Sequence, residues 1–292
     1  MESGKEVAVK LEAANAKSPQ LLHEARLLAS IAGGDGLPRV HWWGVGGGFA
    51  VMVMDLLGPS LEDLFKFCKN RFSLKTTLML ADQVLNRIEY VHANSLVHQD
   101  IKPDNFVIGL GSRANQVHII DFGLAARWRD TRTGEHIPRA EGLSLVGTAR
   151  FASVNAHVGI TQSRRDDLEA MGFMMMYFLA GKLPWLGIHA SSQKAKYEKI
   201  KEAKMSIPLE ELCAGLPSEF VAFFAYCRNL AFEDQPDYEY LRRLLKGVFE
   251  REDYEYDFVF DWTLEAMRCD HSGSTASANS ASGQVQEVAV AA

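Results

Sequence analysis

Apolar and polar residues alternate in short runs over the first part of the chain, a pattern typical of β-strands. Residues 7–11 (Val-Ala-Val-Lys-Leu) alternate, and residues 40–43 and 49–54 form two more apolar runs joined by glycines within 44–48. Between the first two runs, apolar residues recur at helical spacing from about residue 19 to residue 31. The pattern therefore predicts three strands and one helix.

Beyond residue 60 the apolar residues follow helical spacing almost throughout. Residues 61–67 and 74–92 are predicted helices, and the second presents one continuous apolar face. A longer and more apolar helix begins near Asp167 and ends before Pro184. Further helices are predicted at residues 197–201, 209–213, 219–230 and 238–249.

The change from strand patterns to helix patterns near residue 57 predicts an α+β protein with two lobes. Residues 1–56 are expected to form a β-rich small lobe, and residues 57–266 a mainly helical large lobe. Residues 267–292 are mostly small and polar and cannot bury enough apolar surface to order themselves, so we expect a disordered tail. The length of 292 residues allows a sizeable core and one or two domains.

Composition narrows the classes of function. A net charge of -6 gives no support for a general nucleic-acid binder. The most apolar run, residues 173–180, is much shorter than the about 20 residues that a membrane span needs. The four cysteines form no Cys-x-x-Cys pair, which indicates free thiols in a reducing compartment rather than a zinc site. We therefore expect neither nucleic acid nor membrane as a partner.

Candidate chemistry is concentrated in residues 97–105. Asp100 is followed by Lys102 and then by Asn105, and Asp121 begins an Asp-Phe-Gly triplet after a short apolar run. Phosphoryl transfer uses such a set, because a carboxylate orients the attacking hydroxyl and an ammonium neutralises phosphate charge. Amide and carboxylate oxygens, here Asn105 and Asp121, are suitable ligands for Mg²⁺. Each motif alone could be a polar turn, but their order and spacing predict a phosphotransferase site with Asp100 as catalytic base.

These motifs resemble the catalytic loop and the metal loop of protein kinases, which implies a bilobal kinase fold that uses ATP and Mg²⁺. The resemblance implies that Lys10 contacts the ATP phosphates and pairs with Glu24. Taken alone, each of these two residues is typical of a solvated surface charge, and the downstream motifs favour the pairing. The segment after residue 54 corresponds to the hinge that binds adenine, with Asp55 and Leu57 beside the base and Met54 guarding the pocket behind it.

Two further positions bear on the kinase resemblance. Asp167 matches the buried helix Asp of kinases, which accepts hydrogen bonds from the backbone of the catalytic loop. Gln99 departs from the family, because kinases usually carry Arg immediately before the catalytic Asp. The polar stretch from Arg127 to Arg150 is the activation segment by its position. Because Gln99 carries no charge, it cannot form an ion pair with a phosphorylated residue of that segment, so we predict that phosphorylation between Arg127 and Thr148 is not needed for activity.

Longer stretches resemble the casein kinase 1 family. They are residues 57–64, 102–106 and 162–169, together with Ser153-Val154-Asn155, where most kinases have Ala-Pro-Glu. The resemblance implies a Ser/Thr kinase, monomeric and cytoplasmic with the nucleus as a second location. Its protein substrates would carry an acidic or phosphorylated residue before the target Ser or Thr. It also implies an anion site formed by Arg150, Gly187 and Lys196, although each cation alone is equally typical of a solvated surface.

The largest departure from the kinase pattern lies at the start of the sequence. Only nine residues precede Lys10, which leaves no room for the glycine-rich hairpin that covers the ATP phosphates in kinases. The small lobe is therefore expected to be incomplete and ATP binding to be weak. Two hypotheses follow: an active Ser/Thr kinase, favoured by the retained charged residues, or a pseudokinase-like binding scaffold, favoured by the missing hairpin.

Overall fold

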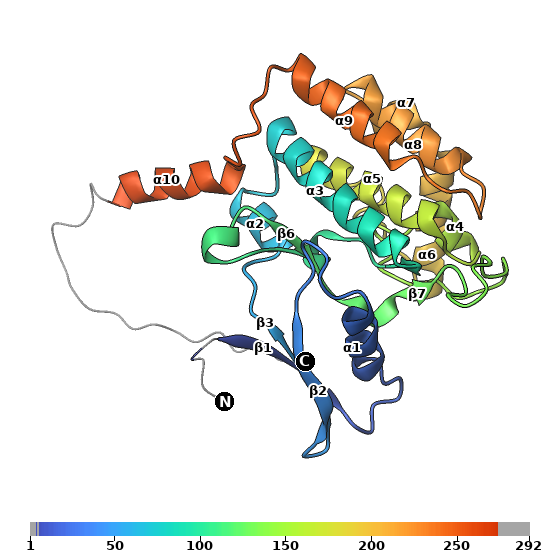
Figure 1. Cartoon of the computed structure of the whole chain (residues 1–292). Coiled ribbons are helices and arrows are strands. Elements are labelled where there is room, and N and C mark those ends of the chain that lie inside the picture. The colour runs from blue at the N-terminus through green and yellow to red at the C-terminus, as the bar shows by residue number, and fades with distance from the viewer. Residues whose placement is uncertain (1–3, 5, 274–292) are drawn as a thin grey trace.

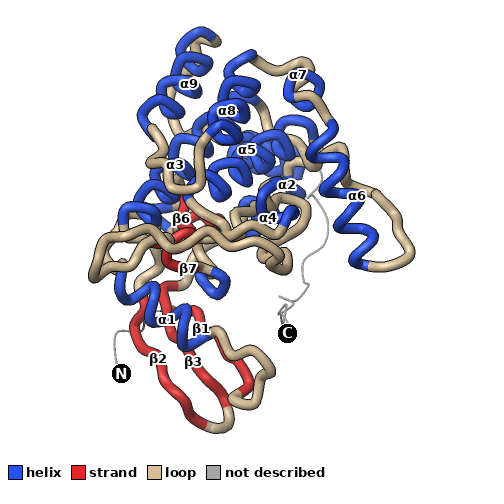
Figure 2. The backbone as a smooth tube through the Cα atoms, turned by 90° about the vertical axis from the view of Figure 1, so that its right-hand side faces the viewer, coloured by secondary structure: helices blue, strands red, loops and turns tan. Residues whose placement is uncertain are grey.

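The structure, a computed structural model, describes residue 4 and residues 6–273 of the chain. Strands gather in its N-terminal part and helices form most of the rest, as the colours from blue to red show in Figure 1. Figure 2 shows the same division from the side, with the three longest strands at one end of the molecule. The predicted α+β arrangement of a small β-rich part and a larger helical part is confirmed.

A three-stranded antiparallel sheet forms the N-terminal part. Its strands, in the order β1-β3-β2, are β1 (Val7–Ala13), β3 (Phe49–Asp55) and β2 (Val40–Gly46). Alternation along β1 places Lys10 on the face toward helix α1 (Leu21–Ser30), whereas Val9 on the opposite face is 55% exposed. Helix α1 packs against β3 and buries Glu24 on its inner side. The sheet and α1 thus bring a cation and a carboxylate together.

The larger part is built around one buried helix, α5 (Arg164–Ala180). Helix α3 (Leu74–Ala93) packs on α5 and on α9 (Tyr238–Arg251), and α8 (Ser218–Asn229) packs on both α5 and α9. The remaining helices are α2 (Leu61–Phe67), α4 (Val154–Val158), α6 (Gln193–Ser206), α7 (Leu209–Leu212) and α10 (Asp261–Gly273). Two short antiparallel pairs are β4 (Leu96–Val97) with β7 (Ala126–Arg127), and β5 (Phe106–Ile108) with β6 (Val117–Ile119).

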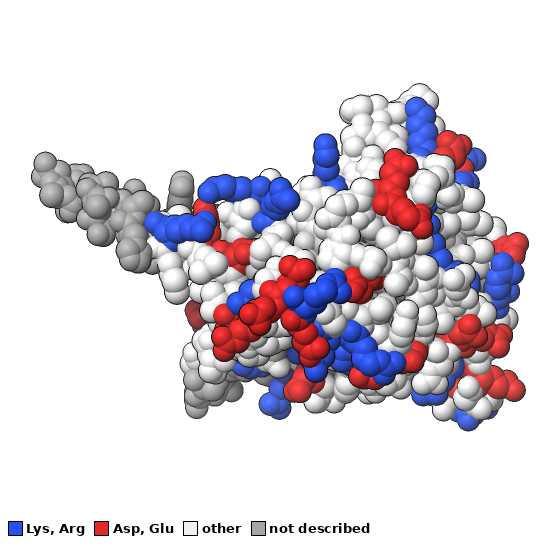
Figure 3. Space-filling model, turned by 90° about the horizontal axis from the view of Figure 1, so that it is seen from above, with Lys and Arg blue, Asp and Glu red and all other residues white. Residues whose placement is uncertain are grey.

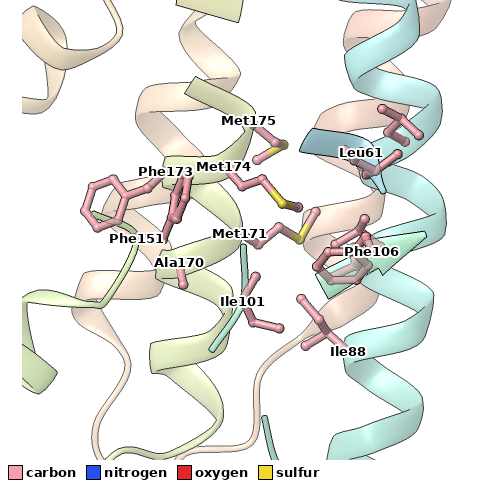
Figure 4. Packing of buried hydrophobic residues seen from close by; sticks show 14 of the residues in the cluster. Leu61, Ile88, Ile101, Phe106, Phe151, Ala170, Met171, Phe173, Met174 and Met175 are labelled. Carbon is pink, nitrogen blue, oxygen red and sulfur yellow. The ribbon is translucent and has the colours of Figure 1, made fainter. Parts of the chain in front are cut away.

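Helix α5 occupies the core because it is apolar on nearly every side. Figure 4 shows Met171 extending from α5 toward Phe106, with Ile101 close by and Phe173 and Phe151 on the other side of the helix. Burying a large apolar side chain stabilises a fold by about 1.5–3 kcal/mol, and truncating a core Phe to Ala costs about 3–5 kcal/mol. Since Ile101 follows Asp100 directly, this core is the support on which the candidate catalytic loop lies.

Two sequence-based predictions need correction. Helix α6 begins at Gln193 and ends at Ser206, well beyond the predicted residues 197–201, because good helix formers without apolar periodicity fill it and Ser192 caps it. The tail was predicted to begin at residue 267, but α10 continues to Gly273. This helix is anchored at its start, where Asp261 accepts hydrogen bonds from Ser73. Residues 274–292 lie outside the described residues, so disorder there stays a prediction.

Charged side chains are distributed over the surface of the larger part. On the face seen in Figure 3, acidic and basic side chains are interspersed rather than separated into fields of one sign. Some of them connect helices, as where Arg242 on α9 binds Glu89 on α3 at 2.6 Å. Within the described ranges, no helix combines the length and the apolar content needed to cross a bilayer.

Candidate active site

Asp100 lies in the loop between β4 and β5, and hydrogen-bond donors surround its buried carboxylate. One oxygen accepts hydrogen bonds from the backbone N–H and the hydroxyl of Thr148, both at 2.8 Å. The other accepts from the Lys102 ammonium at 2.6 Å and from the Asn105 amide at 3.2 Å. The structure thus brings the predicted base together with its two predicted neighbours, and the four donors fix the direction of both carboxylate oxygens.

Asp167, near the start of α5, anchors the same loop. One carboxylate oxygen accepts the Gln99 N–H at 2.9 Å, and the other accepts the His98 N–H at 2.7 Å and bonds His92 Nε2 at 2.9 Å. Complete burial raises the pKa of Asp167, but the hydrogen bond and charge of His92 outweigh burial, so the pKa lies below its ordinary value. The loop N–H donors were expected from the sequence, and His92 was not. The loop backbone is therefore held by an ionised carboxylate.

Asn105 and Asp121 belong to adjacent segments. The N–H of Ile120 donates to the carbonyl of Asn105 at 2.9 Å, which joins the catalytic loop to the segment that carries Asp121. The Asn105 amide nitrogen points to Asp100, so its oxygen is the atom left for a cation. Asp121 is 42% exposed at its side chain and sits in the left-handed backbone region, with φ 64°. This pair of hard oxygen donors fits Mg²⁺, which takes its remaining ligands from phosphates and water.

Lys10 links the small sheet to this metal-binding segment. Its ammonium lies 2.7 Å from Glu24 and 3.0 Å from Asp121. Burial lowers the pKa of Lys10, but Glu24 and Asp121 outweigh it and the pKa is raised. For Asp121 the signs are reversed: burial raises the pKa, but the charge and hydrogen bond of Lys10 outweigh burial, so the pKa is lowered. Both groups are therefore charged near neutral pH, as phosphate and metal binding require.

Among the predicted hinge residues, Asp55 is buried, and Met54 and Leu57 are half-buried. Asp55 is buried at the end of β3, where its carboxylate accepts the Arg39 N–H at 3.2 Å and bonds His41 Nε2 at 3.0 Å. Its side chain is thus committed to holding β2 against β3, and its backbone N–H donates to the carbonyl of Arg39 at 3.0 Å. The role of this segment as a hinge and its contact with adenine stay predictions.

A cavity of about 430 Å³ brings together the three predicted anion-site residues, and we call it the anion groove. Its lining comprises Gly147, Thr148, Ala149, Arg150, Trp185, Leu186, Gly187, Gln193, Lys196, Tyr197 and Ile200. In the part of the chain that the structure describes, neither Arg150 nor Lys196 has an ion-pair partner. Gly187 has a φ of +86°, which favours glycine at this turn. Because Thr148 lines the groove and also binds Asp100, the groove lies directly beside the candidate catalytic loop.

Two features of the site were not predicted from the sequence. Thr148 joins Asp100 to the end of the activation segment, and no local pattern in the sequence indicates this contact. Glu169 on α5 accepts the Val154 N–H at 3.1 Å and pairs with Arg228 on α8 at 2.8 Å. This pair fixes the segment in which Ser153-Val154-Asn155 replaces Ala-Pro-Glu. No local pattern connects Glu169 with Arg228, which lies 59 residues away.

Fold and site together define a phosphotransferase: a β-rich part with a Lys–Glu pair, a helical part with the Asp100 loop, and oxygen ligands for a metal between them. The protein kinase domain family matches residues 1–251, and the chain belongs to this family. Kinase activity in the general sense, with ATP as phosphoryl donor and Mg²⁺ as metal, is what this family implies.

Proposed function

We propose that this protein is a Ser/Thr kinase that phosphorylates protein segments in which an acidic or phosphorylated residue precedes the target Ser or Thr. One observation carries the proposal. Thr148 lines the anion groove, which contains Arg150 and Lys196, and its hydroxyl also donates a hydrogen bond to the carboxylate of Asp100. A peptide lying along this surface can place a negative charge in the groove while its hydroxyl approaches Asp100. The resemblance to casein kinase 1 supports the same substrate class.

The residues around Asp100 account for phosphoryl transfer. The Asp100 carboxylate, which already binds the Thr148 hydroxyl, accepts the proton of the substrate hydroxyl as that oxygen attacks the γ-phosphorus of ATP. The bond from the γ-phosphorus to the bridging oxygen breaks, and ADP leaves with that oxygen. Lys102 lies beside the reacting groups and neutralises negative charge that spreads over the phosphoryl oxygens. Asn105 and Asp121 are the residues that would hold Mg²⁺, which would supply neutralisation of phosphate charge there. Lys10 keeps its charge between Glu24 and Asp121, where it contacts phosphate oxygens.

The substrate preference follows from the chemistry of the anion groove. An Arg guanidinium and a Lys ammonium without ion-pair partners in the described residues favour carboxylate or phosphate. Because Lys196 is exposed, its contribution is small and screened by salt over about 8 Å at physiological ionic strength. Arg150, which is only half-exposed, should contribute most of the preference. A hydrogen bond between charged groups contributes about 1.5 kcal/mol or more, so an acidic residue in the peptide should improve binding by about tenfold at low salt.

Phosphate transfer to paired peptides tests the proposal. One peptide carries Asp three residues before the target Ser, and the other carries Ala there. We expect transfer to both from MgATP, a preference for the Asp peptide that shrinks with added salt, and loss of that preference in Arg150→Ala combined with Lys196→Ala. Asp100→Asn should remove transfer to both peptides. An unchanged preference in the double variant would refute the assigned substrate class.

The same experiment separates the enzyme from a binding scaffold. A scaffold would bind the Asp peptide through the anion groove without transferring phosphate, and Asp100→Asn would change nothing. Thermal stabilisation by ATP with and without Mg²⁺ provides an independent readout, because binding of a ligand to the folded state raises its stability. Stabilisation that requires Mg²⁺ and is lost in Asp121→Ala supports the kinase.

A further inference from the structure

The ammonium of Lys204 binds the backbone on both sides of Arg150. It donates hydrogen bonds to the carbonyl of Ala149 at 2.9 Å and to that of Ala152 at 2.5 Å. Lys204 is only 1% exposed, although lysine is among the residues least often fully buried. Removing an ammonium from water costs free energy that an apolar side chain of similar size would not incur. The two carbonyl groups that it binds are what this buried amine contributes to the fold.

Lys204 is also surrounded by two aromatic rings and lies near one negative and one positive side chain. Its nitrogen lies 4.7 Å from the ring centre of Phe173 and 4.9 Å from that of Trp185, a cation–π arrangement. Burial lowers the pKa of Lys204 to about 7, while Glu169 on α5 acts to raise it and Arg228 on α8 acts to lower it. The aromatic faces and Glu169 compensate part of the lost hydration. The ammonium is buried from solvent, and both of its hydrogen bonds go to the segment from Ala149 to Ala152.

Two other side chains complete the hold on this segment. The indole N–H of Trp185 donates to the carbonyl of Arg150 at 2.8 Å, and His157 on α4 donates to that of Ala149 at 2.9 Å. Burial, aided by the Lys204 charge, lowers the pKa of His157 to about 4, so His157 is neutral near pH 7. The carbonyls at positions 149, 150 and 152 are thus all occupied by donors from outside the segment. The backbone of Arg150 has little freedom, and its side chain lies over Phe151 and Tyr177.

Helix α6 connects Lys204 to the anion groove. Lys196, Ile200 and Lys204 are spaced four residues apart, so they lie along one face of α6. Lys196 and Ile200 line the groove itself, and Lys204 lies one turn further along, beneath its floor. One helix therefore provides a cation at the mouth of the groove and the clamp that holds the opposite wall.

We propose that Lys204 is a positioning residue for substrate recognition, which holds the segment from Ala149 to Ala152 so that Arg150 meets the anionic residue of the substrate. This inference rests on the proposed substrate class. Loss of the clamp lets the segment relax and separates Arg150 from Lys196. The binding of acidic peptides then weakens, while the chemistry at Asp100 continues.

Steady-state kinetics of Lys204→Met with the Asp and Ala peptides test the proposal. We expect KM for the Asp peptide to rise about tenfold, with KM for the Ala peptide and both kcat values changed less than about twofold. In an Arg150→Ala background, Lys204→Met should have little further effect on the ratio of the two KM values, because coupled residues are not additive. Lys201→Met on the same helix is the matched control, since Lys201 pairs with Glu198 at the surface. It should leave the ratio unchanged.

The possible outcomes distinguish a failure of the positioning role of Lys204 from a failure of the proposed substrate class. If Arg150→Ala changes the peptide preference and Lys204→Met does not, Lys204 has no positioning role and the proposed substrate class stands. If Arg150→Ala leaves the preference intact, the substrate class itself is wrong. A merely structural Lys204 would lower kcat for both peptides equally through loss of folded protein. Should Lys204→Met not fold, Trp185→Phe removes the neighbouring bond to Arg150 and is expected to raise KM selectively for the Asp peptide; an unselective effect would overturn the proposal.

Discussion

Thr148 donates two hydrogen bonds to the same oxygen of Asp100, although 48 residues separate the two in the chain. The close approach depends on Gly147, which has a φ of +92° and whose added Cβ would lie 2.3 Å from the carbonyl oxygen of Gln99. The hydrogen bonds from Thr148 to Asp100 therefore hold the end of the activation segment against the catalytic loop. The carboxylate that we propose as the base is oriented by the same residue that lines the anion groove.

Replacing Thr148 by Val removes the hydroxyl and leaves the backbone N–H in place. The lost hydrogen bond to a charged group is worth about 1.5–3 kcal/mol, so kcat should fall by about 10- to 100-fold. Thr148→Ser keeps the hydroxyl and should remain within about threefold of the parent protein. Phosphate transfer to the Asp peptide measures both. A Thr148→Val protein with the parent kcat would show that the hydroxyl does not orient the base.

The pair of Glu169 and Arg228 should matter for stability rather than for chemistry. Arg228→Met leaves the buried Glu169 carboxylate without its cation, which should cost about 3 kcal/mol in the free energy of unfolding. Adding Glu169→Gln to this variant should recover part of the loss, because the uncompensated charge is then gone. Denaturant unfolding measures both effects.

A surface pair between α8 and its other neighbour, α9, provides the control. Arg251 on α9 binds Glu219 on α8 at the protein surface, and Arg251→Met should cost less than about 1 kcal/mol. Equal losses in the Arg228 and Arg251 variants would contradict the assigned role of the buried pair.

The sequence was most informative where the relevant residues are close along the chain. Asp100, Lys102 and Asn105 lie within six positions, and together with the nearby Asp121 triplet their order and spacing indicated phosphoryl transfer. The sheet and α1 could also be predicted, because alternating and helical spacing reflect burial on one face. The pairing of Lys10 with Glu24 depended on resemblance to kinases, since neither residue stands out locally.

Contacts that depend on tertiary packing could not be predicted. Lys204 lies in a helix rich in lysine, and nothing in its sequence distinguishes it from the exposed Lys194 and Lys199. Its partners Ala149 and Ala152 lie more than fifty residues earlier and contribute only backbone atoms. A carbonyl group is present at every residue, so the sequence cannot show which ones a buried ammonium binds.

Activity should not depend on phosphorylation of the activation segment. Gln99 carries no charge, and its N–H is bound to Asp167, so it offers no cation for a phosphate. The segment is instead held by direct bonds, such as that from the Trp128 indole to the carbonyl of His92 at 2.8 Å. Phosphatase treatment, verified by mass spectrometry, should leave kcat within about twofold. Loss of activity that an upstream kinase restores would show that a phosphate is required after all.

The titration of Lys204 should appear in the pH dependence of stability. Burial lowers its pKa from 10.5 to about 7 in the folded protein. Between these two values the unfolded chain binds more protons than the folded chain, so the contribution of Lys204 to stability rises with pH across that window and is constant below about pH 7. From pH 7 to 8.5 the free energy of unfolding of the parent protein should gain about 1–2 kcal/mol relative to Lys204→Met. Lys196→Met, which removes an exposed ammonium, should follow the parent protein, and parallel curves for parent and Lys204→Met would mean that Lys204 keeps an ordinary pKa.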